Sequence, residues 1–187
     1  YRRDLPPPPP LWEFGPVQLQ DFGATQSNGE AGKPVLVIPS LVNRCYIMDL
    51  TAERSFLRFL ASQGLRPLLV DWGTPSEREL AQTLDDCVDG ILRNALSIAV
   101  ETAAGNSVPV IGYCMGGTLA TALAVLEPEK CGALVLLASP WDFHAGTEGP
   151  PAAVTTGRPI LENLISLSGC LPVDALQSMF FSLDPML

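Results

Sequence analysis

Residues 108–118 read Val-Pro-Val-Ile-Gly-Tyr-Cys-Met-Gly-Gly-Thr, and this stretch decides the fold. Its apolar first four residues are typical of a buried strand, and residues 118–126 predict a helix. The G-x-C-x-G pattern of Gly112, Cys114 and Gly116 therefore lies between a strand and a helix, which is the context of a nucleophile elbow. Such a turn is sharp and strained, and the two glycines leave room for the helix to approach the strand.

Cys114 is the candidate nucleophile. At an elbow the central side chain projects above the sheet at a helix N-terminus, where the helix dipole favours a thiolate. The amide of Met115 then points to the place where an oxyanion would form. The second oxyanion amide usually comes from a loop after an earlier strand, here residues 39–44, so Val42 or its neighbour is the candidate. Each of these interpretations has a simpler alternative. Cys114 could be an ordinary buried cysteine, and residues 39–44 could be an ordinary connecting loop.

The chain around this stretch alternates strand and helix. Short apolar runs predict strands at residues 34–38, 67–70, 108–111 and 133–138. Between them we expect a helix capped by Asp49, a long amphipathic helix over 84–99 and the helix over 118–126. This βαβαβαβ pattern predicts an α/β fold with a mostly parallel sheet and flanking helices.

The chain is expected to have three segments. Residues 1–33 form a proline-rich arm, Pro6–Pro10, and an edge hairpin over Leu11–Phe22. Residues 34–144 form the core. Residues 145–187 begin as a loop over 146–159 and continue as short helices over 161–167 and 173–181, the start of a helical lid or cap. The arm either lies on the domain surface or is a ligand for an SH3 or WW domain.

The composition argues for a folded domain and against several partners. Of the 187 residues, 47% are hydrophobic and 17% are charged, which argues against disorder. A net charge of −9 gives no electrostatic footprint for nucleic acid or an anionic membrane. Five cysteines without a CxxC pair predict neither a disulfide framework nor a metal site. This cysteine usage favours a reducing environment, so we expect a cytoplasmic protein. No stretch resembles a signal peptide or a membrane span.

Three stretches together resemble the polyhydroxyalkanoate synthases, whose fold is the α/β-hydrolase fold. The first is residues 34–50, Pro-Val-Leu-Val-Ile-Pro-Ser-Leu-Val-Asn-Arg-Cys-Tyr-Ile-Met-Asp-Leu. The second is Leu69-Val-Asp-Trp-Gly73 with Leu84-Asp85-Asp86 and Gly90. The third is residues 112–117, followed by Pro128-Glu-Lys130 and Pro140-Trp-Asp-Phe143. Cysteine where most lipase boxes have serine is the most specific sign.

The resemblance implies an acyltransferase that polymerises 3-hydroxyacyl groups taken from coenzyme A thioesters. The thioester is its substrate, no other cofactor is implied, and a polyester granule is the expected further partner. By the same resemblance, Cys114 carries the acyl group and the amides of Val42 and Met115 form the oxyanion hole. A histidine deprotonates the thiol and an aspartate orients the histidine. Acyl chain length and oligomeric state are not specified by these residues.

The sequence differs from the synthases in its catalytic acid and base. In the synthases both residues lie on loops near the C-terminal end of the fold. The sole histidine here is His144, with Asp142 two residues before it. That spacing makes it hard for Asp142 to orient His144 beside Cys114. We therefore expect a C-terminally truncated fragment that is inactive alone. Two other functions stay open: a hydrolase of the same fold, such as an esterase, thioesterase or depolymerase, and a non-catalytic granule- or partner-binding relative.

Three further residues have two interpretations each. Arg44 lies in the proposed oxyanion loop, either solvated or in contact with a coenzyme A phosphate. Trp72 and Trp141 follow strand ends, where they either line an acyl pocket or pack as ordinary aromatic residues.

Overall fold

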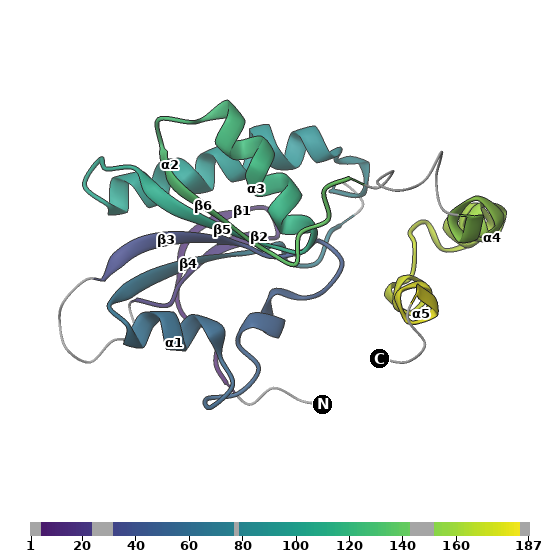
Figure 1. Ribbon diagram of the computed structural model, residues 1–187, viewed down its shortest axis with the longest axis horizontal. Helices are drawn as coiled ribbons and strands as arrows, with labels where there is room; N and C mark the ends of the chain where they lie inside the picture. The colour runs from purple at the N-terminus through teal and green to yellow at the C-terminus, as the bar shows by residue number, and fades with distance from the viewer. Residues whose placement is uncertain (1–4, 24–31, 77–78, 143–151, 184–187) are drawn as a thin grey trace. The chain divides into compact units, whose positions relative to one another are not determined.

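The computed structural model describes residues 5–23, 32–76, 79–142 and 152–183 (Figure 1). Contacts divide the chain into two units, Tyr1–Pro140 and Trp141–Leu187. The proposed segment bounds after residues 33 and 144 stay predictions, although strands from both sides of residue 33 share one sheet.

A six-stranded sheet in the order β1-β2-β4-β3-β5-β6 organises the first unit. Its strands are β1 Pro10–Phe14, β2 Val17–Asp21, β3 Lys33–Ile38, β4 Leu65–Asp71, β5 Val108–Tyr113 and β6 Cys131–Leu137. Strands β4, β3, β5 and β6 run parallel, while β2 is antiparallel to both β1 and β4. All four strands predicted between residues 34 and 138 are present, so the predicted α/β fold with a mostly parallel sheet is confirmed.

Helices cover both faces of this sheet (Figure 1). On one face lie the π-helical η3 Asp86–Leu92, α2 Arg93–Thr102 and α3 Met115–Leu126, packed on the larger core cluster. On the other face lie the 3-10 helix η1 Cys45–Met48 and α1 Phe56–Ser62, packed on the smaller cluster. The short η2 Glu79–Ala81 precedes η3. Apolar residues along β3, β4 and β5 are buried on both faces, as a sheet between two helix layers requires.

The proline arm ends on the sheet. Pro8 is buried, and the Pro9 carbonyl accepts a hydrogen bond from the Asp21 N–H at 3.1 Å. β1 and β2 form the predicted hairpin, with Gly15 at φ 57° in its turn. The described part of the arm therefore lies on the domain surface.

The predicted helix cap at Asp49 is wrong. Helix α1 begins at Phe56, and Ser55 caps it by accepting a hydrogen bond from the Arg58 N–H. Asp49 is instead buried and forms an ion pair with Arg58 at 2.8 Å. A buried carboxylate needs such a partner, which the sequence pattern around Asp49 did not reveal.

The second unit contains α4 Ala152–Ser168 and α5 Val173–Leu183. The predicted loop over 146–159 is wrong from residue 152 onward, because α4 continues through Pro159. Proline lacks an N–H and usually ends a helix, which is why the pattern indicated a loop. The predicted helix over 173–181 is confirmed by α5. Within the described ranges no helix is long and apolar enough to cross a membrane.

Candidate active site

The candidate site lies at the carboxyl edge of the sheet, where β3 and β5 end side by side. From β3 the chain passes to β4 on one side, and it returns to β5 on the other. In open α/β sheets ligands bind outside the carboxyl ends of the strands at such a reversal of strand order. Residues 39–44 follow β3 and Cys114 follows β5, so both predicted parts of the site meet at this position.

Cys114 has a strained backbone, with φ 53° and ψ −130°. For a residue other than glycine such a conformation costs roughly 1–3 kcal/mol and persists only where the surroundings enforce it. Here the Cys114 N–H donates to the Leu137 carbonyl, and the Cys114 carbonyl accepts from the Gly117 N–H, both at 2.8 Å. The side chain is half-buried, and α3 begins at the next residue. This is the backbone of an elbow between strand and helix.

No side chain fits at Gly112 or Gly116. A Cβ atom at Gly112 would lie 2.8 Å from the Cβ of Ala120, and one at Gly116 would lie 2.5 Å from the Pro39 carbonyl oxygen. Both distances are below 3.0 Å, which is closer than Cβ atoms approach other heavy atoms in real structures. The first turn of α3 therefore packs directly on β5 and on the backbone of residue 39, which brings the elbow against the predicted oxyanion loop.

The two predicted oxyanion amides differ in whether they already have a hydrogen-bond acceptor. Met115 is the first residue of α3, so its N–H has no acceptor within the helix. The Val42 N–H instead donates to the Ser40 hydroxyl at 3.1 Å, and Ser40 is only 2% exposed. Sequence analysis missed Ser40, although a serine two residues before a donor is a known signal of this local turn. Any oxygen that binds the Val42 amide must compete with Ser40.

Two side chains hold residues 39–44 against the end of β4. The Trp72 indole N–H donates to the Pro39 carbonyl at 3.2 Å. The Arg44 guanidinium donates to the Gly73 carbonyl at 3.0 Å and to the Thr74 hydroxyl at 2.9 Å. Arg44 is therefore an exposed arginine whose side chain connects two loops, and no observation tests its alternative role as a contact for a coenzyme A phosphate.

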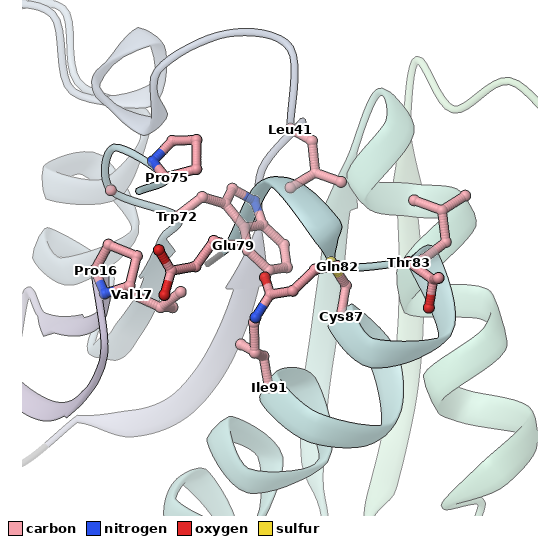
Figure 2. A pocket seen from close by; sticks show the side chains of 12 residues that line it. Pro16, Val17, Leu41, Trp72, Pro75, Glu79, Gln82, Thr83, Cys87 and Ile91 are labelled. Atoms are coloured by element: carbon pink, nitrogen blue, oxygen red, sulfur yellow. The ribbon is translucent and has the colours of Figure 1, made fainter. Parts of the chain in front are cut away.

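Trp72 also lines a cavity of about 280 Å³ at the same edge of the sheet (Figure 2). Its wall includes Leu41, next to Val42, and the buried Cys87 of η3. Burial, and to a lesser degree the neighbouring Asp86 carboxylate, raises the pKa of the Cys87 thiol above its ordinary value. Cys87 is therefore a neutral, small apolar residue at pH 7 rather than a nucleophile.

The structure does not test the roles considered for Trp141, Asp142 and His144 in relation to Cys114. His144 lies outside the described residues, and Asp142 and Trp141 belong to the second unit. In the ranges that the structure describes, no group of His, Cys, Asp and Glu could hold a metal ion.

The fold and the elbow define the class of protein. Residues 33–155 match the family described as alpha/beta hydrolase fold. The chain belongs to the α/β-hydrolase family.

Within this family the chain is similar to poly(3-hydroxyalkanoate) polymerase subunits, as predicted. It is 41% identical to the subunit of Haloferax mediterranei over 106 residues, which are 57% of this chain and 22% of the relative. It is 34% identical to the subunit of Synechocystis over 157 residues, which are 82% of this chain and 42% of the relative. The chain thus spans less than half the length of these relatives.

Solved structures agree on the fold. A thioesterase domain from the curacin biosynthetic pathway matches 83% of this chain and 51% of its own length, with a TM-score of 0.55 and 20% identity. At this identity the likeness shows the α/β-hydrolase fold alone.

Proposed function

We propose that this chain carries the nucleophile of an acyltransferase that polymerises 3-hydroxyacyl groups from coenzyme A thioesters. One observation supports the proposal above the others: a cysteine at a strained strand–helix turn, in a chain similar to poly(3-hydroxyalkanoate) polymerase subunits. The reaction belongs to the cytoplasm, where thiols stay reduced and the five cysteines of this chain stay free.

The chemistry has two acyl transfers. The Cys114 thiolate attacks the thioester carbonyl, the bond to coenzyme A sulfur breaks, and the leaving thiolate takes a proton. The amides of Met115 and Val42 stabilise the oxyanion that forms on the way. A hydroxyl of a second 3-hydroxyacyl group then attacks the acyl-cysteine while a base takes the hydroxyl proton. An ester bond forms and the Cys114 thiolate is released.

A thiol nucleophile suits this sequence of steps. Transfer from one thioester to another is nearly isoenergetic, so the acyl group stays activated for the incoming hydroxyl. The chain spans less than half the length of the polymerase subunits that it matches. We therefore expect the 187-residue chain to be inactive alone, and the assays belong to the complete natural protein.

The test measures release of coenzyme A from 3-hydroxybutyryl-CoA. Cys114→Ala should lower the rate by at least about 10³-fold, as loss of a nucleophile does in other enzymes. Cys131→Ala, at the far end of β6, is the matched control and should retain the wild-type rate. Turnover by Cys114→Ala would overturn the proposal.

Product analysis separates the two classes of enzyme. Polymer is the expected product, and free 3-hydroxybutyrate would identify a hydrolase of the same fold instead. A non-catalytic protein would release no coenzyme A, and its Cys114 would react with iodoacetamide no faster than a free thiol at pH 7.

A further inference from the structure

The cavity beside Trp72 lies where an acyl substituent would need space. It is at the carboxyl edge of the sheet, as Cys114 is, and it shares a wall with the predicted oxyanion loop. Leu41 supplies that wall, and Val42 is the next residue along the chain. The opposite wall is Cys87 and Ile91 of η3, with the Trp72 ring between the two walls (Figure 2).

The lining of this cavity is mainly apolar, with three polar side chains, Glu79, Gln82 and Thr83 (Figure 2). Two polar residues of its lining use their side chains elsewhere: the Glu79 carboxylate accepts the Ser76 N–H at 2.8 Å, and the Thr83 hydroxyl donates to Asp86 at 2.8 Å. The Cys87 thiol is buried and neutral. The side chains that remain toward the space are the apolar Leu41, Trp72, Cys87 and Ile91, together with the uncharged amide of Gln82 (Figure 2).

The size of the cavity fits part of a substrate. Its volume of about 280 Å³ is close to the lower end of small-molecule pockets. At about 30 Å³ for each water-sized group, it holds roughly nine such groups. That is enough for a short alkyl chain, and far too little for a coenzyme A molecule.

We infer that this cavity receives the alkyl side chain of the 3-hydroxyacyl group and that Cys87, by its small size, sets how long that chain can be. This inference rests on the proposed function. One methylene group in a hydrophobic pocket changes kcat/KM by about 10- to 200-fold. Changes in cavity volume should therefore appear in the ratio of kcat/KM for a longer substrate to that for a shorter one.

The experiment compares 3-hydroxyhexanoyl-CoA with 3-hydroxybutyryl-CoA in the complete natural protein. Cys87→Leu fills the cavity and should lower the ratio of kcat/KM, longer over shorter, by at least about tenfold. Leu41→Ala enlarges the cavity from the other wall and should raise that ratio. It adds no atoms to the core, so it tests the inference even if Cys87→Leu does not fold. Taking the ratio cancels any effect of Leu41→Ala on the neighbouring oxyanion loop.

Cys131→Leu is the matched control, because Cys131 is a half-buried cysteine at the start of β6 and does not line the cavity. In this control the ratio of kcat/KM, longer over shorter substrate, should stay within about twofold of wild type. That is well below the change of about tenfold or more expected when the cavity is filled. If the wild type releases coenzyme A but a folded Cys87→Leu and Leu41→Ala both leave the ratio unchanged, the inference about the cavity is overturned and the proposed function stands. If the wild type releases no coenzyme A from either thioester, the proposed function fails and the inference falls with it.

Discussion

At the scale of the residue, the site depends on how closely α3 approaches the end of β3. Gly116 permits that approach, since the carbonyl oxygens of Ile38 and Pro39 lie where its Cβ would be. The strained Cys114 and the loop over 39–44 are thereby held by the same contact. A displacement of α3 would move the candidate nucleophile and a candidate oxyanion amide together.

Gly116→Ala tests this contact. The added methyl group overlaps backbone atoms, which cannot rotate away, so we expect a loss of about 1–3 kcal/mol in the free energy of unfolding. Gly90→Ala is the matched control, because no atom lies within 4 Å of the Cβ position at that helical glycine. It should stabilise the protein by about 0.5–1 kcal/mol. Urea denaturation measures both, and equal effects would contradict the close packing.

Ser40→Ala tests the competition for the Val42 amide. Removing the hydroxyl leaves this N–H without its internal acceptor and so available to the substrate oxygen. A neutral hydrogen bond contributes about 0.5–1.5 kcal/mol, so coenzyme A release should become roughly two- to tenfold faster. A slower variant with unchanged thermal stability would mean that Ser40 assists the Val42 amide instead of competing for it.

At the scale of the element, the start of η3 is fixed by a reciprocal pair. The Asp86 carboxylate accepts hydrogen bonds from the Thr83 N–H and the Thr83 hydroxyl, both at 2.8 Å, and the Thr83 hydroxyl accepts from the Asp86 N–H at 3.2 Å. This is a capping box, and it orients the segment that carries Cys87. The hydrogen bonds from Thr83, the backbone one first, lower the pKa of Asp86 below its ordinary value.

A lowered pKa makes this cap sensitive to pH. Its stabilising contribution is present above the unfolded value of about 3.9 and is lost as the pH falls through the folded value. Asp86→Asn should therefore lower the melting temperature at pH 7, and the difference from wild type should close below about pH 4. Asp85→Asn removes the same charge without touching Thr83, and it should have the smaller effect. A difference that persists at low pH would contradict this account.

The elements that sequence analysis predicted correctly are those set by local patterns. The four parallel strands have continuous apolar runs, and the glycines around Cys114 define a strand–helix turn. The two errors have different causes, a side-chain partner nine residues away in one case and an exception to a general rule in the other. Asp49 is buried because Arg58 pairs with it, and α4 runs through Pro159 despite the missing N–H.

The candidate site also has parts that the local sequence predicts and parts that depend on contacts between distant segments. The turn at Cys114 and its glycines was predictable from their spacing together with the strand before it and the helix after it. The hydrogen bond from the Trp72 indole to the Pro39 carbonyl joins residues 33 positions apart. The cavity that Cys87 lines is formed by segments from β2 to η3. No local pattern reports contacts of this kind.

At the scale of the whole molecule, the sheet ends on an apolar parallel strand. Among the described residues β6 pairs with β5 alone, and Leu134, Val135 and Leu136 are 37–46% exposed. Val125 and Leu126 at the end of α3 are also exposed. An exposed apolar edge strand is a template for pairing with another chain. The 187-residue chain expressed alone should therefore self-associate.

Val135→Lys tests association through this edge. In a pair of chains joined along β6, two lysines would face each other, and like charges brought together cost several kcal/mol. The dissociation constant should accordingly rise by roughly tenfold or more, measured by sedimentation equilibrium. Gln63→Lys adds the same charge just beyond α1, away from the edge, and should leave the constant unchanged. If both variants weaken association equally, β6 is not the interface. Repulsion between whole chains would have the opposite effect, because an added lysine lowers the magnitude of the net charge of −9 and so strengthens association in both variants.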